Sequence, residues 1–260
     1  MGRMMPVAYS KLVYAQADGI ARVTLNRPDK RNALDRELIS ELKAAFIDAG
    51  ADEAVRVIVL RGAGKDFCAG MDLGELRNLQ ELDVMENRAD AESLRELFVQ
   101  MRRLQKPIVA AVHGRALAGG CGLATACDLI VAAHSAQFAY TETRIGFVPA
   151  IVSAIVRRAV SEKRAFEMLV RAEPFSATEA ERLGLINRVF EDSAFDSQVE
   201  EFVSHFRSLS SSAVALTKSL LYATDGMPWE QAMGAAVDVN TIARLTDDCK
   251  QGVAQFLKKK

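Results

Sequence analysis

The segment 106–133 constrains the fold more than any other part of the chain. KPIVAAVHG (106–114) and DLIVAA (128–133) are short and mostly apolar, which is typical of buried strands. Between them, ALAGGCGLATAC (116–127) starts with a glycine pair at Gly119 and Gly120 and continues as an apolar helix. A strand, a helix and a strand in this order predict parallel strands joined by crossover helices, and hence an α/β fold.

The other predicted strands and helices continue this alternation. KLVYAQADGIARVTL (11–25) predicts a hairpin around Ala-Asp-Gly, and VRVIVLRG (55–62) predicts another buried strand. DRELISELKAAFIDAGAD (35–52) has helical spacing, with Asp35 as N-cap and Gly50 as C-cap. Further helices are predicted over 75–105 and from Ser153 onward, with a capping box at Ser176 and Glu179 and a stop at Gly184 before the strand-like INRVF.

Composition limits the class of protein. The chain has 260 residues, half of them apolar, which is enough for one sizeable core at 1–195 followed by a helical appendage at 196–260. Its net charge of −1 offers no field that would attract nucleic acid or an anionic membrane. The four cysteines lack CxxC pairing, and no apolar run suits a signal peptide or a membrane span. We therefore expect a cytoplasmic protein with no membrane or nucleic-acid partner.

Several common catalytic motifs are absent. RGAGKD (61–66) lacks the first glycine and the final Ser/Thr of a phosphate-binding loop, so a tight turn is the better interpretation. No GxSxG nucleophile elbow occurs. The three histidines, His113, His134 and His205, are isolated, so no metal site is expected.

Three features suit chemistry on a carbonyl group, and the first and the last also have a purely structural explanation. Gly119 and Gly120 could open a helix with unblocked N–H groups for an oxyanion, or could simply allow close packing. A second glycine loop, FCAGMDL (67–73), could aim another N–H group at the same oxygen, with Asp72 as a helix cap. Glu142, in the loop FAYTETRIGFVPA, could be an acid/base of raised pKa or an ordinary surface glutamate.

Four motifs occur in a diagnostic order: NRPDKRNAL, FCAGMDL, AGGCGLATACD and AQFAYTETRIGFVPA. Together with SATEAERLGLINRVF and the terminal GVAQFLKKK, they resemble the enoyl-CoA hydratase/isomerase (crotonase) superfamily over nearly the whole chain. The resemblance implies a spiral of ββα turns with a helical C-terminal trimerisation region, assembled as a homotrimer or homohexamer. It also implies an acyl-CoA thioester as substrate, with coenzyme A as part of that substrate and no separate cofactor.

The resemblance assigns roles to individual residues. The thioester oxygen would bind the N–H groups of Met71 and Gly119, each such donor being worth roughly 3 kcal/mol, and Glu142 would be the acid/base. The NRPDKRNAL loop would cradle the CoA, with Arg27, Lys30 and Arg31 as phosphate partners. The remaining positions assigned to substrate and CoA binding are Ala33, Ala69, Asp72, Leu73, Gly74, Gly120, Phe256 and Lys259.

One position departs from the pattern of simple hydratases. Those enzymes hold a water between two glutamates, the second matching Glu142 and the first matching Gly122, which carries no acid. The favoured activity is an enoyl-CoA hydratase-type lyase, possibly for a branched or carboxylated chain such as methylglutaconyl-CoA. A Δ3,Δ2-enoyl-CoA isomerase using Glu142 alone is the alternative, and a non-catalytic acyl-CoA- or RNA-binding relative is the second alternative. Ala150, where an aspartate would be needed, argues against a 3-hydroxyisobutyryl-CoA hydrolase or a dienoyl-CoA isomerase.

Overall fold

The chain folds around a six-stranded sheet. The computed structural model describes residues 9–258. The strand order is β1-β2-β3-β4-β6-β9, where only the β1–β2 hairpin is antiparallel and every other pairing is parallel. These strands are β1 (Leu12–Ala17), β2 (Ile20–Leu25), β3 (Val57–Gly62), β4 (Ile108–Val112), β6 (Leu129–Ala133) and β9 (Arg188–Phe190). The predicted hairpin and the parallel central strands are confirmed.

A second, smaller sheet stands beside the first. It has the order β5-β7-β8 and comprises β5 (Arg115–Leu117), β7 (Gln137–Ala139) and β8 (Phe175–Ser176). β5 and β7 are parallel, with Leu117 opposite Ala139. None of these three short strands was expected from the sequence. β5 directly follows β4, and β7 directly precedes the segment that contains Glu142. The pairing of β5 with β7 therefore places that segment near the end of β4.

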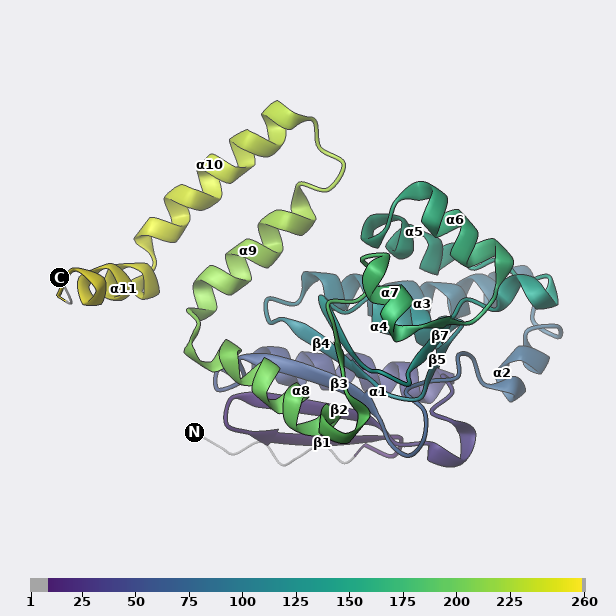
Figure 1. Cartoon of the computed structure of the whole chain (residues 1–260). Coiled ribbons are helices and arrows are strands. Elements are labelled where there is room, and N and C mark those ends of the chain that lie inside the picture. Colours follow the sequence, from purple (N-terminus) through teal and green to yellow (C-terminus); the bar gives the residue numbers. More distant parts are fainter. Residues whose placement is uncertain (1–8, 259–260) are drawn as a thin grey trace.

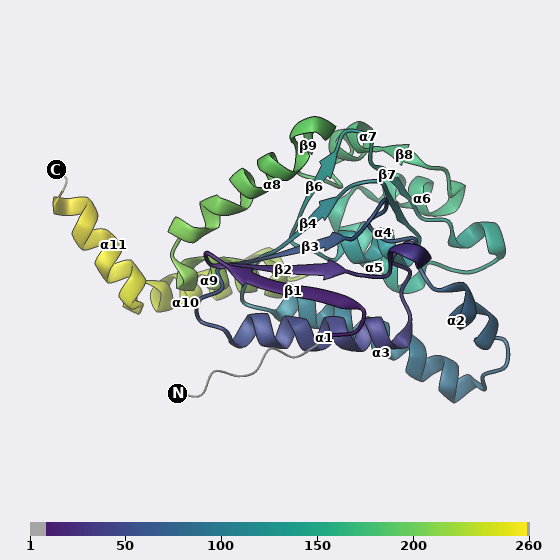
Figure 2. The ribbon, with the colours of Figure 1, turned by 90° about the horizontal axis from the view of Figure 1, so that it is seen from below.

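Helices cover the sheet and extend from it. In Figure 2, α1 and α3 lie on one side of the large sheet and α8 crosses its other side. The α-helices are α1 (Arg36–Ala51), α2 (Leu73–Asn78), α3 (Val84–Arg103), α4 (Gly119–Thr125), α5 (Ala150–Ala159), α6 (Glu162–Arg171), α7 (Ala177–Arg182), α8 (Phe195–Ser204), α9 (Ser211–Ala223), α10 (Trp229–Leu245) and α11 (Asp247–Lys258). Short 3-10 turns, η1 (Pro28–Lys30), η2 (Glu142–Ile145), η3 (Asp192–Ala194) and η4 (His205–Ser208), connect some of them.

Several expected helix boundaries shift. Asp35 caps α1 as predicted, because its carboxylate accepts from Leu38 N–H, but the helix runs through Gly50 and ends at Ala51 with Asp52 as C-cap. At the start of α7, Ser176 accepts from Glu179 N–H, which is one half of the predicted capping box. The buried core continues through Phe195, Val199 and Val203 of α8, past the expected boundary at 195.

Of the last three helices, α9 keeps a buried contact with the core through Lys218, and α10 and α11 have none. Figure 1 shows α9, α10 and α11 extending away from the sheet. No residue of α10 or α11 is buried. None of the helices within residues 9–258 is long and apolar enough to cross a lipid bilayer.

Candidate active site

Two glycine-containing loops meet where β3 and β4 end. Because these neighbouring strands are parallel, the loops that follow them leave the same edge of the sheet. Cys68 of the first loop pairs with β5: its N–H donates to Arg115 O at 3.1 Å, and its carbonyl accepts from Leu117 N–H at 2.9 Å. This pairing places the residues after Cys68 beside the residues that open α4.

Gly70 brings the two loops into contact. It adopts a φ of +96°, which L side chains rarely reach, and a β-carbon there would lie 3.0 Å from the Ala118 Cβ and 3.5 Å from Gly119 N. Ala118 itself has φ 47° and ψ −127°, a strained conformation at the start of α4. Strain of this kind is common where a backbone group is aimed at a ligand.

Two backbone N–H groups at this contact are available to a ligand. Within residues 9–258, neither Met71 N–H nor Gly119 N–H donates a hydrogen bond, while Ala118 N–H donates to Ala139 O at 2.7 Å. Met71 follows Gly70 directly, and Gly119 is the first residue of α4, where helical N–H groups have no internal partner. Such a pair of donors can stabilise an oxygen that gains negative charge.

The two adjacent glycines have different explanations. A β-carbon on Gly120 would lie 2.4 Å from Cys68 O and 2.7 Å from its Sγ, so Gly120 is required for packing. At Gly119 the nearest neighbour of such a β-carbon would be Leu34 Cδ1, at an ordinary 3.8 Å. Close packing therefore explains Gly120 but does not explain Gly119.

Glu142 lies on the segment that follows β7 along α4. β7 pairs with β5 up to Ala139, whose carbonyl accepts from Ala118 N–H just before α4, and the hydroxyls of Tyr140 and of Thr125, the last residue of α4, are 2.8 Å apart. Glu142 begins η2 and is only 9% exposed. Its Oε2 is buried without a hydrogen-bond partner among the described residues. The surface interpretation of Glu142 is therefore wrong.

Burial sets the proton affinity of this carboxyl group. Desolvation raises the pKa of Glu142 above its usual value, because no cation offsets the loss of water. A carboxyl group of raised pKa can both take and return a proton near neutral pH. Burial also raises the pKa of the Cys68 and Cys121 thiols to about 12, so neither thiol supplies a thiolate nucleophile.

Val152 fills the space beside Gly122. A β-carbon added to Gly122 would lie 2.5 Å from Val152 Cγ2, where α5 packs on α4. Both residues are buried, with Val152 4% exposed. The position of the missing glutamate is thus closed by a valine side chain. Nothing in the sequence indicated this contact, because it joins two helices that are far apart along the chain.

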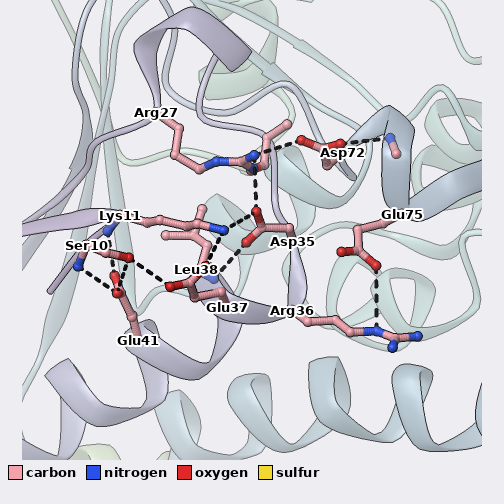
Figure 3. A network of polar contacts seen from close by, with 12 residues as sticks. Ser10, Lys11, Arg27, Asp35, Arg36, Glu37, Leu38, Glu41, Asp72 and Glu75 are labelled. Carbon is pink, nitrogen blue, oxygen red and sulfur yellow. Dashed lines mark hydrogen bonds and ion pairs between the residues drawn. The ribbon is translucent and has the colours of Figure 1, made fainter. Parts of the chain in front are cut away.

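The expected CoA-binding residues lie in different settings. Lys30 and Arg31 are exposed and form no ion pair within residues 9–258, so they could meet a phosphate. The Arg27 guanidinium, in contrast, already contacts the carboxylates of Asp35 and Asp72 (Figure 3). Leu73 is 74% exposed at the start of α2, and Asp72 is the N-cap of that helix, accepting from Gly74 N–H at 2.8 Å.

The other residues expected to bind the substrate or CoA are Ala33, Ala69, Phe256 and Lys259. The Ala33 carbonyl accepts from Arg27, and Ala69 N–H donates to Arg31 O at 3.0 Å. These main-chain groups of Ala33 and Ala69 therefore take part in hydrogen bonds that hold the loops in place. Phe256 is on α11, which both views place at the opposite end of the molecule from α2 and α4, so the structure does not bring it to this site within one chain. Lys259 lies outside the described residues. No group of three His, Cys, Asp or Glu residues within 9–258 is arranged to hold a metal ion.

Known proteins match this chain along almost its full length. The family model described as enoyl-CoA hydratase/isomerase matches residues 15–260. A Thermus thermophilus protein with a provisional name as an enoyl-CoA hydratase is 40% identical over 249 residues, covering 96% of this chain and 98% of its own. A crotonyl-CoA hydratase of Syntrophomonas wolfei is 31% identical over 258 residues, covering 98% and 97%. The crystal structure of a Mycobacterium smegmatis enoyl-CoA hydratase superposes with a TM-score of 0.91 at 35% identity, covering 96% and 97%.

Proposed function

The chain belongs to the enoyl-CoA hydratase/isomerase (crotonase) family of acyl-CoA enzymes, and from this premise we propose that it hydrates and dehydrates a 2-enoyl-CoA. The proposed substrate oxygen is the thioester carbonyl, bound by Met71 N–H and Gly119 N–H. The observation that carries the proposal is Glu142, a buried carboxyl group of raised pKa whose Oε2 has no partner among the described residues. A proton carrier needs that environment, and a structural glutamate does not.

The proposed reaction uses one carboxyl group twice. The Glu142 carboxylate takes a proton from water as the water oxygen bonds to C3, and the C2=C3 electron pair moves onto the thioester as an enolate. The two N–H groups stabilise the enolate oxygen. The protonated Glu142 then gives its proton to C2, so one water is added across the double bond and the carboxylate is restored. Dehydration follows the same steps in reverse.

The acyl chain is the finer part of this proposal. We propose a branched or carboxylated acyl chain, such as that of methylglutaconyl-CoA, because the run FVPAIVS and the small residue at Gly122 resemble family members described for such substrates. Leu73 and Val148 are exposed and could line an acyl site, whereas Phe138 is fully buried and stacks on Phe175 at 5.9 Å.

A Δ3,Δ2-enoyl-CoA isomerase is the second candidate, and the contact between Gly122 and Val152 favours it. With Val152 in place, position 122 has no room for a second carboxylate to orient a water, and an isomerase needs none. Glu142 would take a proton from C2 of a 3-enoyl-CoA and return it to C4 as the double bond moves to C2=C3. We place hydration first because relatives over the full length of the chain are named hydratases. The buried acid also argues against a non-catalytic acyl-CoA- or RNA-binding relative.

Self-association is a further part of the proposal. The last two helices expose large apolar side chains, among them Trp229 at 72% and Leu245 at 67%. A second copy of the chain would cover them, which supports a homotrimer or homohexamer. Phe256 could reach a CoA only if α11 of one copy approached the site of another.

Product analysis distinguishes the two reactions. The protein is incubated separately with a 2-enoyl-CoA, a 3-enoyl-CoA and methylglutaconyl-CoA. The products are separated by chromatography and identified by their molecular mass. We expect a gain of one water from at least one 2-enoyl substrate. Isomerisation of the 3-enoyl-CoA without water addition to any 2-enoyl substrate would instead establish the second candidate.

A further inference from the structure

Arg27 is the centre of a polar network at the edge of the site. Its side chain is only 14% exposed, and one of its terminal nitrogens lies 2.9 Å from Asp72 Oδ2 and 3.1 Å from Asp35 Oδ2 (Figure 3). The other terminal nitrogen donates to the Ala33 carbonyl. A partly buried guanidinium that bridges two carboxylates holds them in a fixed geometry, because its planar donors are directional.

Both carboxylates cap helices. Asp35 accepts from Leu38 N–H at 2.8 Å and starts α1, while Asp72 accepts from Gly74 N–H at 2.8 Å and starts α2. α2 buries none of its own residues, so its position depends on its N-terminus. Arg27 therefore ties the first turn of α2 to the first turn of α1, which is packed into the core.

Met71 lies between the residues that this network fixes. Leu34 N–H donates to Gly70 O at 2.7 Å, and Asp72 N–H donates to Leu34 O at 2.8 Å, so hydrogen bonds hold the chain on both sides of Met71. Leu34 in turn follows Ala33 and precedes Asp35, and both of these contact Arg27. Arg27 thus contacts both of the segments that these hydrogen bonds join. It contacts the neighbours of Leu34 in the first segment and Asp72, the residue after Met71, in the second.

We propose that Arg27 is a positioning residue for the oxyanion site. It holds the Met71 N–H so that this group and the Gly119 N–H can donate to the same substrate oxygen. This inference rests on the proposed function and replaces the expectation that Arg27 binds a CoA phosphate. A phosphate would have to compete with two carboxylates already at hydrogen-bond distance. Lys30 and Arg31 on the same loop have no such competitors within the described chain and keep the expected phosphate role.

The test measures polarisation of the thioester carbonyl. An enoyl-CoA with an extended aromatic chromophore absorbs at longer wavelength when donors pull electron density onto its carbonyl oxygen. We expect the parental protein to shift this band, and Arg27→Met to lose most of the shift. We also expect Arg27→Met to lower kcat with the parental protein's preferred substrate by roughly tenfold to a hundredfold while KM changes by less than about twofold, because misplaced transition-state donors cost rate rather than binding.

Control variants separate positioning from charge and from folding. Lys11 contacts the Asp35 carboxylate at 2.6 Å but not Asp72, so Lys11→Met should keep the band shift and kcat. Lys30→Met should raise KM for CoA substrates, and less so for 3′-dephospho-CoA substrates. If Arg27→Met does not fold, as judged by circular dichroism, Asp72→Asn replaces it, since the amide oxygen keeps the α2 cap while the ion pair and the hydrogen bond with Arg27 are lost.

Each outcome bears on a separate claim. No band shift with the parental protein would contradict the proposed function itself. A parental shift that Arg27→Met, or Asp72→Asn in its place, retains in full would overturn the positioning role. A rise in KM that disappears with 3′-dephospho-CoA substrates, at unchanged kcat, would return Arg27 to phosphate binding. Partial recovery of kcat in Arg27→Lys would support positioning, because a lysine can satisfy one of the two carboxylates.

Discussion

Gly122 and Val152 meet where α4 packs on α5. The 2.5 Å from a β-carbon at 122 to Val152 Cγ2 is shorter than real β-carbon contacts, and a valine on a helix has little rotamer freedom with which to move. The two residues therefore match in volume, a large one opposite the smallest. This contact gives Gly122 a packing role in addition to marking the place where a second acid is absent.

Substitution at this pair should show the match directly. Gly122→Ala is expected to lower the free energy of unfolding by about 1–3 kcal/mol through overpacking, and Val152→Ala in the same chain should recover part of the loss. Gly234→Ala is the matched control, since a β-carbon there meets nothing within 4 Å and alanine favours a helix. Urea unfolding measures all three. Equal stability of Gly122→Ala and the parent would disprove the contact.

Glu142 should make stability depend on pH in a defined direction. Its pKa is raised by desolvation, so the folded chain holds the proton more tightly than the unfolded chain does. The free energy of unfolding should therefore fall as pH rises above about 4.3, the ordinary glutamate value, and level off above the raised pKa. Glu142→Gln should lose less stability than the parent as pH rises from about 4.3 through the raised pKa.

The control for this pH effect is Glu181→Gln, which changes an exposed glutamate at the end of α7. Urea unfolding at several pH values gives the comparison. Parallel pH curves for the parent and Glu142→Gln would mean that Glu142 titrates as an ordinary surface group.

At the scale of elements, the sequence predicted what local patterns determine. The strands β1 to β4 and β6 are continuous apolar runs or alternate between apolar and polar residues, so the pattern of hydrophobic residues identified them. β5, β7 and β8 have only two or three residues each, and they exist because distant segments pair. Gly50 does not end α1, which continues to Ala51, and a β-carbon at Gly50 would lie 2.7 Å from Leu104 Cδ1.

The same distinction applies to the site. Glu142, Met71 and Gly119 each stand in a motif that is contiguous in sequence. The structure places Gly70, the residue before Met71, against Gly119, and Ala118 N–H donates to Ala139 O, three residues before Glu142. Val152 and the network of Arg27 depend on contacts between segments far apart in the chain, and no local signal marks them. The predicted phosphate role of Arg27 came from the family resemblance of its loop, whereas its nearby carboxylates could not be inferred from spacing.

One buried lysine attaches α9 to the core. Lys218 is 8% exposed, and its Nζ donates to Asp128 Oδ2 at 2.7 Å and to the carbonyls of Met101 and Lys106 at 3.0 Å each. Tyr222, one turn further on, donates to the other Asp128 oxygen at 2.6 Å. Desolvation lowers the pKa of Lys218, and the Asp128 carboxylate beside it opposes this shift.

Breaking this attachment should loosen α9. Lys218→Met leaves Asp128 without its cation and is expected to cost about 3–5 kcal/mol of unfolding free energy. Hydrogen exchange should rise first in α9, while the central strands stay protected. Lys163→Met, at an exposed lysine on α6, should change stability by less than about 0.5 kcal/mol. If Lys218→Met matched that control, the buried pair would not hold α9.

At the scale of the whole molecule, the last two helices expose large apolar side chains. α10 and α11 contain no buried residue, yet Val237, Leu245 and Leu257 are each more than 60% exposed. Surfaces of this kind are costly in water unless another chain covers them. The arrangement of α9 to α11 away from the sheet leaves these faces open to a second copy (Figure 1).

Sedimentation tests this expectation. We expect the protein to sediment as three or six copies, and Val237→Glu with Leu245→Glu to shift it toward the single chain. The site lies at the other end of the molecule, so the double variant should keep the band shift of a bound chromophoric enoyl-CoA. A parental protein that sediments as one chain at all concentrations would rule out self-association through these helices.

The central claim is that Glu142 carries the proton while Met71 and Gly119 hold the thioester oxygen. The most direct measurement is the rate at which a 2-enoyl-CoA gains one water, followed by mass, for the parent and for Glu142→Gln. We predict a loss of about 10²–10⁴-fold in this rate with an unchanged chromophore shift, because the amide keeps the volume but cannot transfer the proton. Water addition by Glu142→Gln at the parental rate would contradict the account.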